Sequence, residues 1–265
     1  MTLVRRAAIF AASCVVAAAW VSVAHADDET GVLVSRHDKY ASPERFVLEF
    51  RFGLYHPRVD SDPSLNAGSS PYRDIFGDTA NFEFAVEFDW AAYRIPHFGT
   101  IGPGFSAGYT SASANAPLAV PEPGGVLSAE NTSLTIFPMY GVLVLRADVI
   151  DRELHVPLVP YVKAGFGWAL WQASDSAGTS SAQNPTTKQE VLGEGKTFGT
   201  QAAVGLALDL NFLDLAAARQ FDSSVGVNHT YAFFEGFWAN LNGLGQTHAL
   251  YVGAYTWAAG IALSF

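Results

Sequence analysis

Phe46-Val-Leu-Glu-Phe-Arg-Phe-Gly-Leu-Tyr55 is the stretch that decides the fold of this chain. Large apolar side chains occupy every second position from Phe46 to Leu54, whereas Glu49 and Arg51 stand between them. This alternation is typical of a β-strand with one apolar face and one polar face. The segment therefore predicts a strand that separates two different environments.

The segment from Phe82 to Trp90 repeats the pattern, with Glu83, Glu87 and Asp89 on its polar face. A soluble β-sandwich would show the same alternation. Here the polar faces are acidic, small or rich in glycine, as in a lumen, whereas large aromatic side chains occupy the apolar faces. This difference favours a transmembrane barrel whose apolar side meets lipid.

Six further segments are predicted as strands, and they span 101–110, 133–148, 161–170, 201–210, 225–233 and 251–265. The segment 133–148 is apolar on both faces. The sequence leaves open which of two sets meets lipid there: Phe137, Met139 and Leu143, or Ile136, Tyr140 and Val142. In the seventh strand, the alternation predicts a lipid-facing set made of Val225, Val227, Tyr231 and Phe233.

The predicted connections alternate in length. The short ones lie near Pro96-His97 and at 149–156 and 213–220, and the long polar ones lie at 56–81, 111–132 and 175–196, with a shorter last one at 240–247. An even number of antiparallel strands can close in a membrane without leaving an edge. The sequence thus predicts an all-β fold, an eight-stranded antiparallel transmembrane β-barrel with short periplasmic turns and long extracellular loops.

The N-terminus has the pattern of an export signal. Arg5 and Arg6 precede an apolar run at 7–23, and Ala24-His25-Ala26 has the small-x-small form of a cleavage site. The competing interpretations are a transmembrane helix, a twin-arginine signal and a lipoprotein signal at Cys14. We expect a cleaved signal peptide at 1–26, a periplasmic N-terminal segment at 27–44 and an outer-membrane barrel at 45–265.

Composition excludes several classes of function. The formal net charge is −10, and loss of the two signal arginines would make it more negative, so no nucleic-acid partner is expected. Cys14 is the only cysteine, so the exported chain would have no disulfide. The seven histidines are scattered without metal-ligand spacing, so neither a metal site nor a cofactor is predicted.

The inward faces of the predicted strands gather charged side chains in one narrow tube. The expected lumen network consists of Glu49, Arg51, Glu83, Glu87, Asp89, Lys163 and Asp209. Glu49 and Arg51 lie on the strand next to Glu83 and Glu87, so cross-strand ion pairs are available. Because carboxylates outnumber cations in this set, the surplus acids are expected to be hydrated, protonated or close to the barrel ends.

The eight alternating segments and the closing Trp257-Ala-Ala-Gly-Ile-Ala-Leu-Ser-Phe265 resemble the small outer-membrane β-barrel proteins of myxobacteria and relatives, a broadly OmpA/OmpW-like group. The resemblance implies fold and location but no defined activity. It also implies an assembly signal, read by the barrel-assembly machinery, at Tyr255, Trp257, Ile261, Leu263 and Phe265. Outer-membrane lipid and lipopolysaccharide are the other expected partners.

Three functions remain open from the sequence. The favoured one is a structural or surface-display protein with a packed lumen, because small eight-stranded barrels have interiors that side chains just fill. The second is a narrow channel or binding site for a small, apolar solute, which inward glycines and long loops would suit. The third is a lipid-modifying enzyme built on His229. A lipid A deacylase would carry serine two residues later, where this chain has Tyr231.

Overall fold

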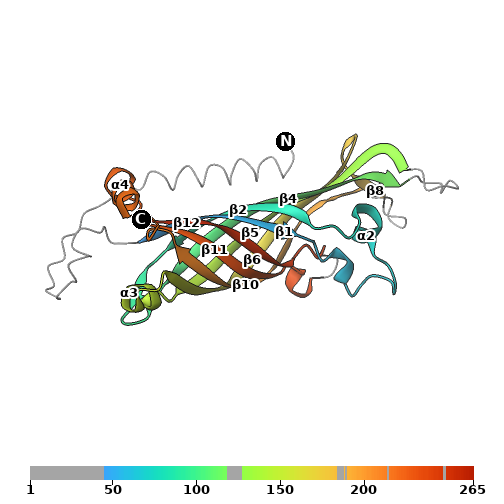
Figure 1. Ribbon diagram of the computed structural model, residues 1–265. Helices are drawn as coiled ribbons and strands as arrows, with labels where there is room; N and C mark the ends of the chain where they lie inside the picture. The colour runs from blue at the N-terminus through green and yellow to red at the C-terminus, as the bar shows by residue number, and fades with distance from the viewer. Residues whose placement is uncertain (1–44, 118–126, 184–187, 189, 214, 247–248) are drawn as a thin grey trace.

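The computed structural model describes residues 45–117, 127–183, 188, 190–213, 215–246 and 249–265 (Figure 1). The predicted signal peptide at 1–26 and periplasmic segment at 27–44 lie outside the described residues. Eight long strands form the wall: β1 (Phe46–Tyr55), β2 (Asn81–Trp90), β4 (Gly99–Pro117), β5 (Leu127–Arg146), β6 (Leu158–Asp175), β10 (Glu194–Asp209), β11 (His229–Asn240) and β12 (Tyr255–Ser264).

These strands close into a ring. Their order is β10-β11-β12-β1-β2-β4-β5-β6, every neighbouring pair is antiparallel, and β6 pairs with β10 to complete the circle. The long register between β6 and β10, from Leu158↔Leu208 to Gln172↔Glu194, shows that the last seam is as complete as the others. The predicted fold class, an eight-stranded antiparallel barrel, is confirmed.

The side-chain facing of β1 and β2 is as predicted. Glu49, Arg51 and Glu87 point inward and are buried, whereas Phe52 and Phe82 are exposed on the outer wall. The open question on the fourth strand is also resolved. Ile136, Tyr140 and Val142 are buried in the lumen, and Leu143 is exposed outside.

The predicted facing of the seventh strand is wrong. Val227 and Phe233 are buried, and Tyr231 packs against the interior, whereas Phe234 and Trp238 are the exposed side chains of β11. Val225 belongs to a helix, not to the strand. The prediction failed because aromatic residues lie on both faces of this strand. Hydrophobicity alone therefore does not decide which face is inside.

The outer wall carries a continuous apolar surface. Exposed large side chains come from all eight strands, among them Phe52, Phe84, Phe105, Leu143, Val162, Val204, Phe234 and Trp257. Soluble monomers rarely expose apolar patches of this extent. A closed ring with charges inside and an apolar exterior is the arrangement of a transmembrane β-barrel.

The two barrel ends differ, but not entirely as predicted. The predicted loop 111–132 is mostly strand, because β4 and β5 continue as a hairpin past the end of β2 and pair as far as Pro117↔Leu127. The predicted loop 175–196 holds the short strands β7 (Gly178–Thr179), β8 (Ser181–Gln183) and β9 (Glu190–Leu192). Ser, Thr, Ala and Asn dominate the hairpin, and because this composition is also typical of loops, the sequence does not predict the strands there.

The predicted short turn at 213–220 is also wrong. The connection from β10 to β11 contains α4 (Leu215–Val225) and is longer than the connection from β11 to β12, which contains η2 (Gly243–Gly245). The helix α3 (Val149–Leu154) and the strand β3 (Tyr93–Ile95) lie at the same end as α4 and the C-terminus (Figure 1). None of the described helices combines the length and apolar character needed to cross a membrane.

The opposite end carries η1 (Val59–Ser61) and α2 (Pro71–Phe76) (Figure 1). The carboxylate of Asp60 accepts hydrogen bonds from the backbone N–H groups of Tyr72 (2.7 Å) and Arg73 (3.1 Å). It thereby satisfies donors that the first turn of a helix leaves open. This contact fixes α2 over the barrel mouth, where Tyr72 is buried.

Candidate functional site

The middle of the lumen is a layer of buried charges. It consists of Glu49 and Arg51 on β1, Glu83, Glu87 and Asp89 on β2, Arg146 on β5, Lys163 on β6 and Glu235 on β11. Side chains alternate between the two faces of a strand, and each of these residues occupies a position on the inner face. All except Arg146 are 3% exposed or less. We call this set the lumen network.

Lys163 is its centre. The Nζ of Lys163 lies 2.6 Å from Oε2 of Glu49, 2.6 Å from Oε1 of Glu87 and 3.6 Å from Oε2 of Glu235. Three strands thus direct carboxylates at one ammonium group. Such pairing offsets the cost of removing an ammonium group from water.

Arg51 makes a second set of pairs. Its Nη2 lies 2.6 Å from Oε2 of Glu87, and its Nε lies 2.7 Å from Oε1 of Glu235. The hydroxyl of Tyr161 also donates to Glu235, at 3.0 Å. Glu235 was not among the predicted network residues, because the seventh strand was assigned the wrong inward face.

Arg146 is the other residue that the sequence analysis missed. Its Nη2 donates to Oε1 of Glu49 at 2.6 Å and also to Oδ2 of Asp89. The alternation of apolar residues does not decide which face of its strand is inside. A charged side chain within a membrane barrel must point inward, so Arg146 itself carried the signal that would have placed Tyr140 and Val142 in the lumen.

Acids outnumber bases in the lumen network. It holds five carboxylates and three cations, and within the described residues no ion pair involves Glu83. Glu83 lies on the β2 stretch nearest α2, where it is only 3% exposed. The predicted surplus of carboxylates therefore persists, although its members differ.

Apolar layers cover the network on both sides. The α3-side layer consists of Val47, Val159, Tyr161, Ala207, Phe233 and Ala262. The α2-side layer is larger and includes Tyr55, Val59, Tyr72, Ile136, Tyr140, Phe237, Leu241 and Val252. Segments that connect the strands contribute to the second layer, so the mouth of the barrel is filled by folded chain.

Aromatic rings from these layers lie against the cations. The guanidinium of Arg51 lies 5.5 Å from the ring centre of Phe237, and the ammonium of Lys163 lies 5.0 Å from that of Tyr161. Cations at such distances are attracted by the ring faces. The rings therefore contribute to the surroundings of the two cations.

The inward glycines do not leave a passage. A Cβ added at Gly167 would lie 2.5 Å from the ring of Tyr140, and one added at Gly260 would lie 2.6 Å from the ring of Phe233. Large interior rings occupy the space over these glycines. The glycines make room for these rings. The conduit interpretation rested on inward glycines and long loops, and the glycines no longer support it.

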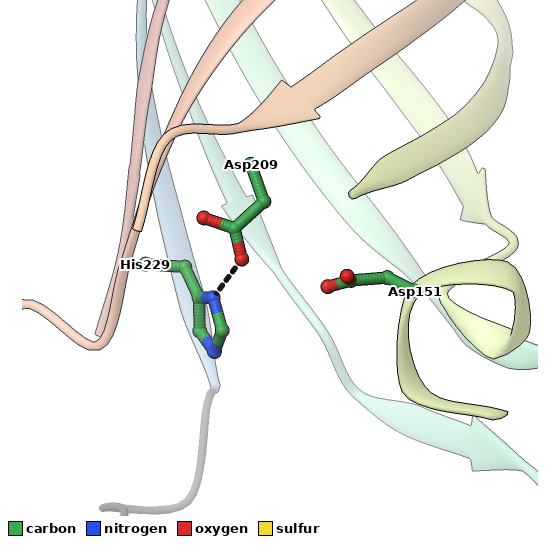
Figure 2. Close-up of side chains that lie close together, drawn as sticks. All are labelled: Asp151, Asp209 and His229. Carbon is green, nitrogen blue, oxygen red and sulfur yellow. Dashed lines mark hydrogen bonds and ion pairs between the residues drawn. The ribbon is translucent and has the colours of Figure 1, made fainter. Parts of the chain in front are cut away.

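Asp209 does not join the lumen network, and its predicted place there is wrong. It lies at the α3 end of the barrel, where its Oδ2 is 2.6 Å from Nδ1 of His229 (Figure 2). His229 was predicted to face lipid. It lies instead beside Asp209 at the rim, with 30% of its side chain exposed.

The carboxylates of Glu49, Glu87 and Asp89 approach one another within 4.8 Å. Such a group could in principle hold a metal ion. Here Lys163 contacts Glu49 and Glu87, and Arg146 contacts Glu49 and Asp89, so protein cations already neutralise it. These contacts give no reason to place a metal ion in the lumen.

The residues of the predicted assembly signal lie on or next to β12. Tyr255, Trp257 and Ile261 are exposed on the outer wall, and the ring of Phe265 lies 6.3 Å from that of Phe46. The N–H group of Phe46 donates to the carbonyl of Phe265 at 2.8 Å. This placement joins the first and last strands of the barrel at one seam. Recognition by an assembly machinery stays a prediction.

Comparison with solved structures finds several outer membrane proteins. The outer membrane protein OprG from Pseudomonas aeruginosa is 10% identical, with 85% of this chain and 97% of that chain covered and a TM-score of 0.43. For Ail, the attachment invasion locus protein of Yersinia pestis, the identity is 10%, the coverage 84% and 97%, and the TM-score 0.41. For the E. coli outer membrane protein W these values are 11%, 85% and 100%, and 0.29.

No protein-family model and no curated protein matches the chain. The assignment of the fold rests on the closed strand order of the chain itself.

Proposed function

We propose that this chain is an integral outer-membrane β-barrel with a structural or surface-display role, and that its lumen is packed and does not conduct. The observation that carries the proposal is the lumen network enclosed between two apolar layers. A water-filled pore needs a continuous polar path, whereas here ion pairs cross the lumen and aromatic side chains cover them on both sides.

Location in the outer membrane is supported by the apolar outer wall and by the export signal expected at 1–26. The segment expected in the periplasm, 27–44, precedes β1, which begins at the α3 end of the barrel. The α3 end would then face the periplasm, and the β4–β5 hairpin and α2 would face the outside. Lipid and lipopolysaccharide would then contact the exposed band that includes Phe84, Val162 and Phe234. Display of the outer loops on a rigid wall fits a surface role.

The conduit alternative has weaker support. The cavity at the α3 end has a volume of about 30 Å³ and is lined by residues that include Val47, Thr100, Arg146 and Tyr231. This volume holds about one or two water molecules. Small-molecule sites are roughly ten times larger or more. No catalytic role is part of the proposal, because no serine follows His229 at the position expected for a deacylase.

Cell fractionation together with heat-modifiable gel mobility tests the proposal. The protein should be found in the outer membrane, begin at Asp27, and migrate differently before and after boiling, because a closed barrel resists unfolding in unheated detergent. Recovery in the soluble periplasmic fraction, or identical mobility with and without boiling, would refute it.

A further inference from the structure

The helix α4 has exposed apolar side chains on one face. Phe221 and Val225 are four positions apart, and residues with this spacing are neighbours on the surface of a helix. Phe221 is 51% exposed and Val225 is 66% exposed. Neither residue belongs to the two apolar layers that fill the lumen. The two side chains therefore lie outside the packed interior of the barrel.

The opposite face of the same helix turn is polar. Ser223 follows Phe221 by two residues, so it lies about 200° away around the helix axis. It is exposed, and its hydroxyl donates to the carbonyl of Gln220 at 3.1 Å. The helix ends at Gly226, which has a φ of 76° and donates its N–H to the carbonyl of Asp222 at 2.9 Å. The last two turns of α4 are thus amphipathic.

The chain holds α4 at the edge of the barrel wall. Before the helix, the N–H of Leu213 donates to the carbonyl of Leu210 at 3.0 Å, and the N–H of Leu210 donates to that of Thr230 on β11 at 2.8 Å. After the helix, the N–H of Asn228 donates to the carbonyl of Ser264 on β12 at 2.8 Å. Both ends of α4 are therefore tied to strand ends, and Figure 1 shows the helix at this rim.

Exposed apolar side chains follow one another along the chain from the wall to the helix. Val204 and Leu206 are exposed on the outer face of β10, and Phe212 and Leu213 are exposed in the turn after it. The next exposed apolar side chain in the described part of this connection is Phe221 on α4. The apolar face of the helix thus continues the surface that meets lipid in a membrane.

The length of α4 gives a reason for this face to be covered. The helix has 11 residues, and isolated helices shorter than about 12 to 15 residues are marginal in water. Such helices gain most of their stability when their apolar face is buried. For a helix tied to the edge of a lipid-facing wall, the apolar medium within reach is the membrane itself.

We propose that α4 lies in the headgroup region of the phospholipid leaflet at the α3 end of the barrel, with Phe221 and Val225 turned toward the acyl chains and Ser223 toward water. This inference rests on the proposed location of the barrel in a membrane. Amphipathic helices that lie in this region bury their apolar face about 5 to 10 Å deep. The helix would then help to fix the depth of the barrel in the bilayer.

Fluorescent labels in phospholipid nanodiscs, which leave both barrel ends open to solvent, test the proposal. Cys14 is the only cysteine, so in a Cys14→Ser background a bimane label can be placed at one introduced cysteine. Labels at Phe221→Cys and Val225→Cys should emit at shorter wavelength than in water. Phospholipid that carries a nitroxide near its headgroup should quench them strongly, whereas aqueous iodide should quench them weakly.

Two further positions make the result decisive. Ser223→Cys is the matched control on the same helix turn, and iodide should quench its label strongly. Val204→Cys lies on the outer wall, so nitroxide lipid should quench its label wherever α4 lies, and this label reports on the barrel alone. Heat-modifiable mobility confirms that each variant is closed.

Three outcomes would overturn the inference. If iodide quenches the labels at Phe221→Cys and Val225→Cys as strongly as the label at Ser223→Cys, α4 lies in water although the Val204→Cys label meets lipid. Labels shielded from both quenchers would show that protein, such as a second copy of the chain, covers this face. A Val204→Cys label that nitroxide lipid does not quench would contradict the membrane location itself.

Discussion

The ammonium of Lys163 lies 2.6 Å from the carboxylate of Glu49, and this contact spans the full width of the lumen. In the ring order, three strands separate β6 from β1 in either direction. The two residues therefore stand on opposite walls. A side-chain contact between opposite walls supports the proposed packing of the lumen at that level.

A double-mutant cycle should reveal this contact. Lys163→Met removes one of the two cations that lie 2.6 Å from Glu49 and one of the two that lie 2.6 Å from Glu87. Because both carboxylates are buried, we expect the free energy of unfolding in urea to fall by roughly 3 to 5 kcal/mol. Glu49→Gln in the same chain should recover part of that loss, with a coupling of about 1 kcal/mol or more. Lys196→Met, on the exposed outer side, is the control and should change stability by less than about 0.5 kcal/mol. Strictly additive effects would argue against a direct pair.

Arg51→Ala should be comparably damaging. The substitution leaves Glu87 and Glu235 without the guanidinium that lies 2.6 and 2.7 Å away. If the site is dry, the barrel should lose roughly 3 to 5 kcal/mol of stability, measured by urea unfolding in bilayers. Arg73→Ala, on the exposed surface of α2, is the matched control. A loss well below about 1 kcal/mol would indicate that water solvates these carboxylates.

Some positions of the lumen network could be predicted from the sequence alone. On β1 and β2, apolar and polar residues alternate cleanly, so the positions of Glu49, Arg51 and Glu87 followed directly from the pattern. On β11 both faces carry aromatic rings, and Phe233 is buried in the lumen while Phe234 is exposed on the outer wall. The charge of Glu235 was the better guide to the inward face of that strand.

The partners within the network could not be predicted. Lys163 and Glu49 are 114 residues apart and meet only because the ring closes with this register. Asp209 has the same inward parity as the network residues, but it stands at the end of β10, and the tilt of the strand carries it to the rim. The alternation along a strand predicts whether a side chain faces the lumen or the outside. It does not predict how far along the barrel axis that side chain lies.

The close approach of β5 to β6 at an inward glycine can be tested with one methyl group. A Cβ at Gly165 would lie 2.0 Å from the backbone oxygen of Gly141, so Gly165→Ala should cost about 1 to 3 kcal/mol in unfolding free energy. Gly141→Ala is the control, because a Cβ there meets nothing within 4 Å. Equal stability of the two variants would show that the lumen wall is looser than described.

A charge on the outer wall tests membrane burial. Val162 is 46% exposed and pairs with Leu145 and Val204 in the apolar band. Val162→Arg should lower the free energy of unfolding in bilayers by roughly 2 to 4 kcal/mol if it lies near the bilayer centre. Val191→Arg is the control, since Val191 is 57% exposed on β9, outside the ring. If both variants behave alike, the band around Val162 does not lie in lipid.

Planar-bilayer recording on the folded, untagged wild-type protein tests the packed lumen most directly. Heat-modifiable mobility of the same sample establishes that closed barrels are present in the membrane. The enclosed ion-pair layer predicts no steady current above that of a protein-free bilayer. A steady, cation-selective conductance that scales with the amount of inserted barrel would contradict the packed lumen and favour the conduit.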